Sequence, residues 1–460
     1  MTDGFRFSNV PDEVAHRILS FLAITDLTRF GCVSKRCREL PLSAPSLDFD
    51  LSTSDYTFAS TCEKRIQLLN YLDSFLCRHG DNKIQRFRVR LECHCVEKKI
   101  KWMADKTRSF RIRREACECR KEYSRIVRWV EIAVRRGVEV LHLEIFIDEK
   151  QCGLDSLVPS CVFLCGSLKT LELDFGMNYP KVLKKPSSSS FSSNLQRLDL
   201  RNVEIHEGFF EWMSSSCKGL KELSLDNCRA ESITIQSSSL ESFRYIYDDD
   251  DLSDFDIIAP NLKCVAWKAN MFVFQNVEKC TRLEKVELLL QPQKHDALVL
   301  FEVLRGISTV KHLTLNHETT MVLFEGGSMP ALENVSYLCL NIYCLCDILV
   351  PAMASLFRGI PNLTTLEITS IWPDLDNCSE FDTRYWKSLN LAFVHKLEEV
   401  DIHMLIGSNA VEFAKYVLEH AQKLKKMRIV HTAEQSKVLW RVNESKKISD
   451  ATLVFEEAEE

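Results

Sequence analysis

The sequence predicts an α/β protein that consists of a small N-terminal helical module, an irregular repeat solenoid and a C-terminal α/β cap. Three observations predict this fold class. Apolar residues at helical spacing fill residues 5–50, one short strand motif recurs from residue 138 onward, and residues 397–460 alternate strand and helix patterns. Residues 51–137 lie between the module and the repeats as a basic, helical connector.

The composition is that of a globular chain and excludes several classes of protein. Of the 460 residues, 45% are hydrophobic and 27% are charged, which excludes a disordered, collagen-like or coiled-coil chain. The formal net charge of −6 does not suit a protein that coats nucleic acid over its whole length. The nineteen cysteines are odd in number and scattered, which is typical of a reducing compartment.

No targeting or membrane segment is expected. The first residues lack the apolar core of a signal peptide. The most apolar stretch, residues 337–357, is interrupted by Asn341, Asp347 and Pro351, so it predicts a strand, a loop and a helix that opens at Pro351. We therefore expect a cytoplasmic or nuclear protein with no membrane partner.

The N-terminal module has the pattern of short amphipathic helices. Pro11 suits the start of a helix, where its missing N–H is not needed, and Thr25 suits the N-cap of a second helix. One apolar face is formed by Val14, Ile18, Phe21 and Leu22. So short a segment cannot bury a core of its own, so it either packs on the rest of the chain or docks on another protein.

The module resembles an F-box, which links a protein to the Skp-type adaptor of cullin–RING ubiquitin ligases. The matching residues are Val10-Pro11, the run Ile18-Leu19-Ser20-Phe21-Leu22, Leu27 and Val33-Ser34-Lys35-Arg36. The resemblance implies that the adaptor is contacted by Val10, Pro11, Ile18, Leu19, Leu22, Leu27 and Val33, and that cullin and RING subunits join through it. Two residues depart from the family pattern: Val10 replaces the usual leucine and Cys37 the usual tryptophan.

One motif, apolar-x-x-apolar-x-apolar, recurs twelve times at steps of 20 to 34 residues. Its units begin at Val138, Leu168, Leu195, Leu220, Leu240, Leu262, Leu283, Val310, Val335, Leu363, Leu397 and Leu424. This motif and period are the signature of leucine-rich repeats, in which stacked strands share a core that no single unit can bury. The repeats lack the regular asparagine of strict versions, so we expect a solenoid over residues 138–396 with uneven connections.

Residues that alternate with the buried pair of each unit point to the opposite face of the strand and are exposed to a partner. The candidate target-binding residues are Glu172, Asp174, Arg197, Asp199, Arg201, Ser224, Asp226, Thr314 and Asn316. These side chains are polar and of mixed charge, which fits a protein partner better than a lipid or a polyanion.

Residues 397–460 resemble the FBD domain that follows leucine-rich repeats in many plant F-box proteins. The matching residues are Val400-Asp401-Ile402, Gly407, the run from Glu412 to Leu418, Ala421 and the run from Leu424 to Met427. Residues 126–145 resemble the junction from helix to first repeat in that family, with Gly137 at the C′ position of the helix. We expect the C-terminal unit to cap the solenoid and cover its last strand edge.

Residues 83–136 contain 18 Lys/Arg against 7 Asp/Glu, which raises the alternative of nucleic-acid binding. Aromatic residues at the stacking spacing of RNA-recognition motifs are absent, and a basic face that is solvated or that faces acidic repeats is the preferred interpretation. The same stretch contains Cys93, Cys95, Cys117 and Cys119, whose C-x-C spacing is a weak zinc pattern, so no metal is predicted.

The sequence contains no G-x-S-x-G, H-E-x-x-H or Walker A motif, so we expect neither a catalytic residue nor a cofactor. The resemblance implies a substrate-recognition subunit of an SCF-type ubiquitin ligase, in which the F-box binds the adaptor and the solenoid binds an unidentified target protein. The alternative is a scaffold that uses the same adaptor but promotes no degradation.

Overall fold

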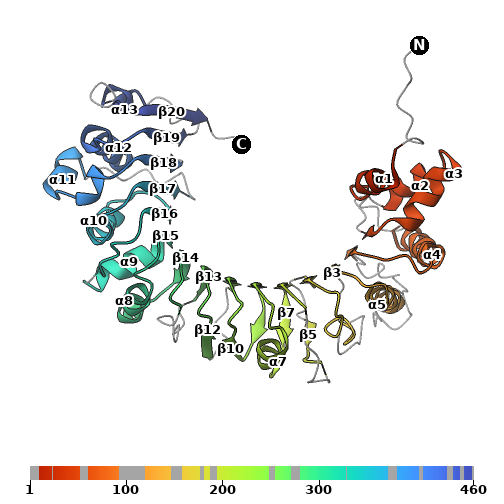
Figure 1. Cartoon of the computed structure of the whole chain (residues 1–460). Coiled ribbons are helices and arrows are strands. Elements are labelled where there is room, and N and C mark those ends of the chain that lie inside the picture. Colours follow the sequence, from red (N-terminus) through yellow and green to blue (C-terminus); the bar gives the residue numbers. More distant parts are fainter. Residues whose placement is uncertain are drawn as a thin grey trace, which may run out of the picture. The chain divides into compact units, whose positions relative to one another are not determined.

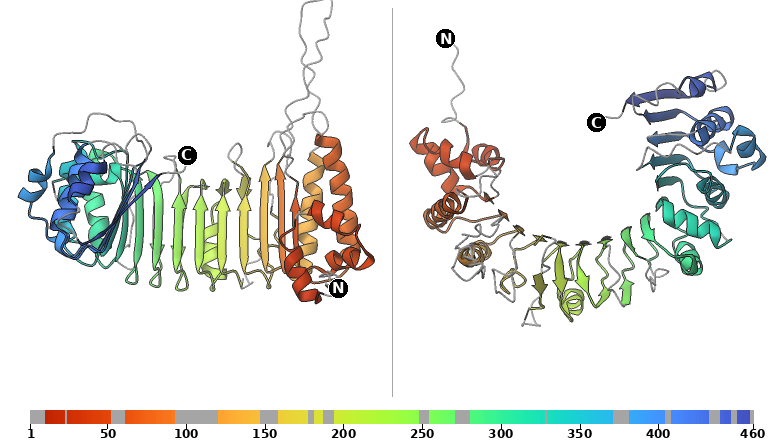
Figure 2. Two further views of the ribbon diagram at one scale, coloured as in Figure 1. Left: turned by 90° about the horizontal axis from the view of Figure 1, so that it is seen from above. Right: turned by 180° about the vertical axis from the view of Figure 1, so that it is seen from behind.

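The computed structural model describes residues 10–22, 24–51, 61–92, 120–146, 158–176, 181–186, 194–247, 254–270, 280–327, 329–370, 381–403, 408–431, 439–445 and 450–457. The chain divides into two compact units, Met1–Ser232 and Ile233–Glu460. In each unit parallel strands form a sheet with helices on one of its faces (Figure 1, Figure 2). Among the described helices, none has the length and apolarity needed to span a bilayer.

The first unit opens with the predicted helical module. Its elements are α1 (Asp12–Leu19), α2 (Ile24–Phe30), α3 (Lys35–Glu39) and the 3-10 helix η2 (Leu40–Ser43). Pro11 directly precedes α1, as predicted, and Ser34 caps α3 by accepting a hydrogen bond of 3.1 Å from the N–H of Cys37. An ion pair of 2.7 Å between Arg36 and Asp12 ties α3 to the start of α1.

The sheet of the first unit has the strand order β1-β2-β3-β4-β6-β8, and each neighbouring pair is parallel. Its strands are β1 (Ser46–Asp50), β2 (Arg86–Glu92), β3 (Val140–Phe146), β4 (Thr170–Asp174), β6 (Arg197–Arg201) and β8 (Glu222–Asp226). The connections contain α4 (Thr61–His79), α5 (Arg120–Arg135), α7 (Phe209–Ser216) and a small sheet of β5 (Lys181–Leu183), β7 (Val203–Ile205) and β9 (Arg229–Ala230).

The parallel array begins at β1 rather than at Val138, where the sequence analysis placed the first repeat. The motif is present in both earlier strands, as Ala44…Leu47…Phe49 and Ile84…Phe87…Val89, and all six side chains are buried. Long segments separate these two motifs from the regular series, which hid their period. The described part of residues 51–137 therefore contains the repeat strand β2 and the helices α4 and α5, and β2 extends the parallel sheet into the predicted connector.

The second unit continues the same architecture in the strand order β11-β13-β14-β15-β16-β17-β18-β19-β20. Its strands are β11 (Ser242–Ile246), β13 (Cys264–Asn270), β14 (Lys285–Gln291), β15 (His312–Asn316), β16 (Tyr337–Ile342), β17 (Thr365–Ser370), β18 (Glu399–His403), β19 (Lys426–His431) and β20 (Thr452–Glu457). The connections contain α8 (Ala297–Gly306), α9 (His317–Glu325), α10 (Leu349–Gly359), α11 (Thr383–Ser388), α12 (Ser408–His420) and α13 (Leu439–Ser445), with 3-10 helices η4 (Lys294–Asp296) and η5 (Ala392–His395) and a small sheet of β10 (Ser232–Gln236) and β12 (Asp254–Ile258).

Each of the twelve predicted motifs forms a strand of this array, which confirms the fold class. The two apolar residues of a motif point to the helical side; Leu313 and Leu315 of β15, for example, are fully buried. The connections are uneven, as expected, because helices follow some strands and short strands follow others. Gly137 has the positive φ of +74° that a C′ residue needs at the end of α5.

A recurring asparagine supports the turns that enter the strands, at a place in the repeat that the sequence analysis overlooked. The side-chain amides of Asn194, Asn261, Asn334 and Asn362 donate to the carbonyl oxygens of Gly166, Ser238, Ser308 and Glu333, over 2.6, 2.7, 3.0 and 2.7 Å. Each asparagine directly precedes the first apolar residue of a motif and bonds to the turn of the preceding repeat. The sequence signal was the recurring pair Asn-Leu or Asn-Val.

Replacing Asn261 with alanine is expected to lower the free energy of unfolding by about 1 kcal/mol, because the carbonyl of Ser238 loses its donor. Urea unfolding at equilibrium measures this change. Asn443→Ala is the matched control, since Asn443 is exposed on α13 and its replacement is expected to change stability by less than about 0.5 kcal/mol. Equal stability of Asn261→Ala and the unmodified protein would contradict the role of the asparagine.

The C-terminal region folds as predicted into strand, helix and strand, which are β18, α12 and β19. It is followed by α13 and β20, and β20 pairs with β19 in parallel. The region therefore extends the sheet of the second unit by further repeats.

Candidate protein-binding surfaces

The helical module divides its apolar residues between its own core and its surface. Of the residues expected to contact an adaptor, Val10, Leu19 and Leu27 are buried inside the chain, with exposed fractions of 6, 2 and 4%. Because they are buried within the chain, they do not face a partner in this structure. The expected residues that reach the surface are Pro11, Ile18, Leu22 and Val33, of which Leu22 is half-buried.

The surface of the module also carries two apolar side chains that were not among the expected adaptor contacts. Val14 is 50% exposed and Phe21 is 81% exposed, while Ile18 between them is 42% exposed. Their spacing of four and three residues places them on one side of α1 and the turn that continues it, where the N–H of Phe21 bonds to the carbonyl of Ile18. We call Val14, Ile18 and Phe21 the α1 apolar face.

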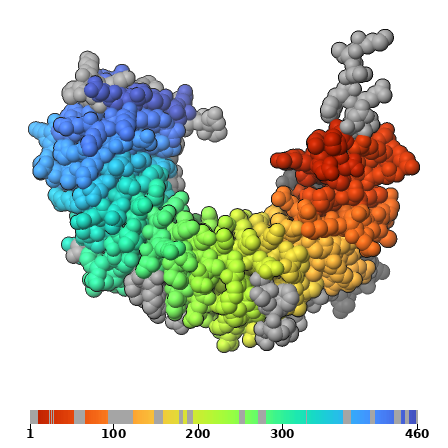
Figure 3. All heavy atoms as spheres, viewed as in Figure 1, coloured from red at the N-terminus to blue at the C-terminus, as the bar shows by residue number. Residues whose placement is uncertain are grey.

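The α1 apolar face belongs to a module whose helices reach the molecular surface (Figure 3). Val33, in the turn before α3, is a further apolar surface residue with an exposed fraction of 74%. Exposed apolar side chains of this size in a cluster mark a protein-binding site more often than a solvated surface. The amphipathic pattern of α1 was the sequence signal for Val14 and Phe21.

The candidate target-binding residues lie, as the alternation rule predicts, on the face of each sheet that points away from the helices. In the first unit the register aligns Glu172 with Asp199 and Ser224, and Asp174 with Arg201 and Asp226. Arg197 stands beside Thr170 and Glu222. Thr314 and Asn316 belong to β15 of the second unit.

Four of these nine residues serve the fold itself. Asp199 is only 4% exposed, because Arg201 and Arg197 cover its carboxylate at 3.2 and 3.7 Å. Thr314, with 9% exposure, is buried between its neighbouring strands. The prediction that both meet a target is therefore not supported by their accessibility.

The side chains of Asp174 and Asn316 are occupied by local hydrogen bonds. The carboxylate of Asp174 accepts from the amide of Asn202 at 2.7 Å. The amide of Asn316 donates to the carbonyl of Leu290 at 2.6 Å, and its oxygen caps α9 by accepting from the N–H of Thr319 at 3.1 Å. Residues with accessible surface that remain candidates for contact with a target are Glu172, Arg197, Arg201, Ser224 and Asp226.

Charges on this open face of the first unit form a ladder across the strands. Arg88 lies 3.5 Å from Asp48 and 2.8 Å from Glu144, and His142 lies 2.8 Å from Glu144 and 3.4 Å from Glu172. Burial raises the pKa of Asp48, against the effect of Arg88. The side chains of these pairs are partly exposed, so a partner can compete for them.

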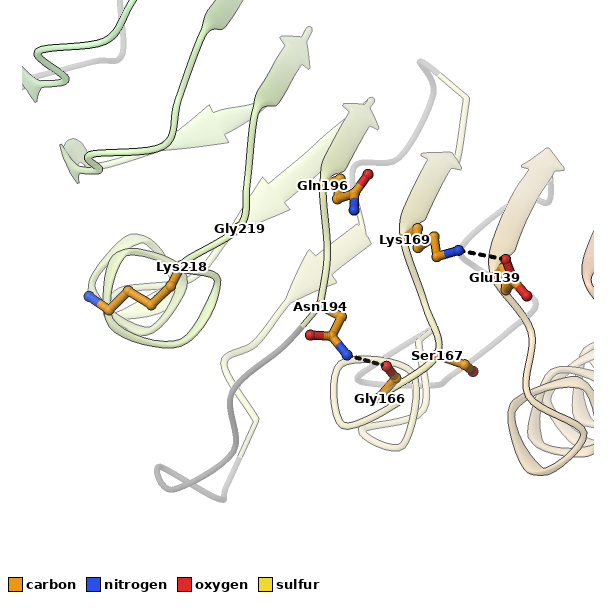
Figure 4. Close-up of a pocket in the computed structure, with 8 residues that line it drawn as sticks. All are labelled: Glu139, Gly166, Ser167, Lys169, Asn194, Gln196, Lys218 and Gly219. Carbon is orange, nitrogen blue, oxygen red and sulfur yellow. Dashed lines mark hydrogen bonds and ion pairs between the residues drawn. The ribbon is translucent and has the colours of Figure 1, made fainter.

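A surface depression of about 500 Å³ lies where the chain enters β4, β6 and β8 (Figure 4). Its polar groups are paired with one another: Lys169 lies 2.8 Å from Glu139, and Asn194 bonds to Gly166. Hydrogen bonds from Lys169 and Lys83 lower the pKa of Glu139 to about 2, so this carboxylate stays ionised in any ordinary buffer. The depression therefore holds a charged ion pair between Lys169 and Glu139.

The cysteines of the possible zinc pattern, Cys93, Cys95, Cys117 and Cys119, lie outside the described residues. Within the described ranges, no group of three or more histidine, cysteine or acidic side chains is arranged to hold a metal ion. Most of the described cysteines are buried or half-buried and act as small apolar residues, whereas Cys32 and Cys77 are exposed.

Alkylation with iodoacetamide at pH 8 is expected to modify Cys32 and Cys77 in the folded protein and to spare Cys228 and Cys339. Burial raises the pKa of both protected thiols to about 12, so the reactive thiolate is scarce and the reagent has no access. Peptide mapping by mass spectrometry measures the modification, and unfolding in urea provides the control in which all four react. Modification of Cys228 as fast as Cys32 would contradict this.

Two family models match the chain. The model of the F-box domain matches residues 7–47, which contain the α1 apolar face, and the model described as FBD-associated F-box protein At5g56370, LRR repeats, matches residues 126–287. The FBD-associated F-box protein At4g13985 of Arabidopsis thaliana is 25% identical and aligns with 98% of this chain and 95% of its own length.

Two further relatives from Arabidopsis thaliana align at similar length. The F-box/FBD/LRR-repeat protein At5g22660 is 24% identical over 95% of this chain and 92% of its own length. The putative F-box/FBD/LRR-repeat protein At5g44950 is 23% identical over 92% of each. With the helical module, the parallel repeats and the C-terminal strand–helix–strand unit, these matches show that the chain is similar over most of its length to F-box/leucine-rich-repeat proteins of Arabidopsis thaliana, several of which carry FBD in their names.

Proposed function

We propose that the chain is the substrate-recognition subunit of an SCF-type cullin–RING ubiquitin ligase. Substrate recognition in such ligases is the general role of F-box/leucine-rich-repeat proteins, which are typically non-catalytic. The observation that carries the proposal is the α1 apolar face, because its exposed side chains lie within the residues that match the F-box model. A Skp-type adaptor covers this face and Val33, and the cullin and RING subunits join through the adaptor.

In this proposal the chain promotes ubiquitination by holding the target near the conjugating enzyme. The junction between the helical module and the repeats therefore has to be rigid. Polar contacts join the helical module to the first repeats. The ring of His79 bonds through Nε2 to the carbonyl of Ala44 at 3.0 Å and through Nδ1 to Arg136 at 3.2 Å. The amide of Asn82 donates to the carbonyl of Leu42 at 2.9 Å. A firm joint raises the effective concentration of a bound target beside the ubiquitin-charged enzyme.

His79 is fully buried at this joint, and burial lowers its pKa, so the ring is neutral at physiological pH. A neutral ring donates from one nitrogen and accepts at the other. This tautomer fits the carbonyl of Ala44 on one side and the guanidinium of Arg136 on the other.

The target protein binds to the open face of the repeats, where Glu172, Arg197 and Arg201 of the first unit keep accessible surface. Their mixed charge favours a protein surface of mixed charge. In this proposal the chain supplies binding and orientation, and every bond is made and broken by the other subunits of the ligase.

Co-expression with a Skp-type adaptor, cullin and RING subunit tests the proposal. A stoichiometric complex on size exclusion and ubiquitination of proteins that co-purify with the repeats are expected. A chain that stays apart from the adaptor would overturn the assignment. The alternative, a scaffold without degradation, predicts the same complex but an unchanged half-life of the bound protein after depletion of this chain.

A further inference from the structure

The C-terminal strand β20 is the least covered strand of the second unit. Its residues Leu453 and Phe455 lie in register with Met427 and Ile429 of β19, which point into the core and are 0 and 1% exposed. Leu453 and Phe455 themselves are only half-buried, although they occupy the same column of core positions. The core of the array is therefore incompletely covered at this strand.

The backbone of β20 also has an open side. The N–H of Thr452 donates to the carbonyl of Lys425 at 2.8 Å, so the backbone groups of Thr452 face β19. Because these groups alternate along a strand, those of Leu453, Phe455 and Glu457 point away from β19. Within the described part of the chain, β19 is the strand that pairs with β20.

The core side chains of the first strand of the array, β1, are fully covered by helices. Its core residues Leu47 and Phe49 are 1 and 0% exposed. The ring of Phe49 packs edge-on against Phe75 of α4 and Trp129 of α5, with centroids 6.2 and 5.5 Å apart. The FBD-like region was expected to cover the last strand of the solenoid, and β18 does so by pairing with β17. Its own outer strand, β20, has less deeply buried side chains than β1.

We propose that β20 is a docking edge for an extended segment of a partner protein, which adds to the sheet as the next parallel or antiparallel strand. An open edge that borders half-exposed core residues gains both backbone hydrogen bonds and apolar burial from such a strand. The proposal concerns a second surface and stands independently of the F-box and its adaptor.

The charge of β20 specifies the chemistry of the segment. Glu456 and Glu457 are exposed, and the sequence continues to two more glutamates at its end. Of the two strand glutamates, Glu456 has a cationic neighbour, Arg428, at 3.0 Å. The complementary segment alternates apolar residues, which cover Leu453 and Phe455, with lysine or arginine. A second copy of this chain fits less well, because β20 contains no lysine or arginine to offset these carboxylates.

The probe for a test is a fluorescein-labelled octapeptide of alternating valine and lysine, added to the full chain and followed by fluorescence anisotropy. Saturable binding is expected. The same peptide with N-methyl groups on alternate residues keeps its charge but loses backbone donors, and it is expected to bind at least tenfold more weakly. Equal binding of the two peptides would overturn strand addition.

Two variants and one control locate the site on the protein. Phe455→Lys puts a charge at the edge and Glu457→Lys reverses an exposed one, and each is expected to weaken peptide binding at least tenfold. Leu298→Lys, at an exposed position of α8, is expected to leave it unchanged. If Phe455→Lys fails to fold, peptide binding by Glu457→Lys still tests the site. If neither variant weakens peptide binding, the peptide does not bind at β20. A dimer of the unmodified chain that Phe455→Lys dissolves would assign the edge to a second copy and overturn the proposed partner.

Discussion

Replacement of Ile18 and Phe21 by aspartate is expected to weaken binding to a Skp-type adaptor at least a hundredfold, with a change in melting temperature of only a few degrees. Both side chains are exposed in the free chain, Ile18 by 42% and Phe21 by 81%, so their replacement removes little internal packing. Covering an apolar side chain of this size gains about 1.5–3 kcal/mol, and a tenfold loss of affinity corresponds to about 1.4 kcal/mol. Burying two carboxylates in the same contact adds a desolvation cost.

Isothermal calorimetry with purified adaptor measures the affinity, and Leu298→Asp is the matched control. Leu298 is an equally apolar surface residue, 77% exposed, on α8 of the second unit, and its replacement is expected to leave adaptor binding unchanged. Leu19→Asp makes the opposite contrast, since Leu19 is 2% exposed and its replacement should unfold the module. Adaptor binding by the double variant at the affinity of the unmodified chain would contradict the role of the α1 apolar face.

The sequence could locate the F-box-like module but not divide its residues into core and surface. The motif that resembles an F-box contains Leu19 and Leu27, which are buried, next to Ile18, which is exposed. A short module uses apolar residues for both purposes, and a one-dimensional pattern does not separate them. The amphipathic pattern of α1 predicted the exposed residues better, because helical spacing indicates which residues lie on one side of a helix.

The repeat strands were predicted well because alternation and period are local properties of the chain. The open face of the sheet was correctly assigned to the alternate residues, yet accessibility was not. Asp199 is covered because two arginines flank it on its own strand, and Asn316 is occupied because α9 begins directly after β15. Such contacts depend on side-chain geometry along a strand and at its junction with the next helix, which the motif does not encode.

The ends of the array were the least predictable part of the fold. At the start, β1 and β2 carry the motif but stand outside the regular period. At the other end, β20 lacks the first apolar residue of the motif, since Asp450 stands three residues before Leu453. Terminal repeats have a neighbour on one side only, so their sequences are under different packing constraints from those of internal repeats.

Replacement of Trp129 by alanine is expected to lower the free energy of unfolding by about 3–5 kcal/mol, the range observed when a large aromatic side chain is removed from a core. Trp129 is 1% exposed on α5 and packs edge-on against Phe49 of β1. Its indole N–H donates to the carboxylate of Asp73 on α4 at 2.6 Å. The side chain of Trp129 thus connects α4 and α5 to β1, the strand that follows the helical module in the sequence.

Urea unfolding and amide hydrogen exchange of β1 measure the effect of Trp129→Ala together. The exchange of Phe49 is expected to accelerate, because the strand loses the ring that covers it. Trp440→Ala is the matched control, since Trp440 is 60% exposed on α13, and its replacement is expected to cost less than about 0.5 kcal/mol. Trp129→Phe keeps an aromatic ring but removes the donor to Asp73, so its cost should lie between the two. Equal effects of Trp129→Ala and Trp440→Ala would contradict the expected contribution of the Trp129–Phe49 packing to stability.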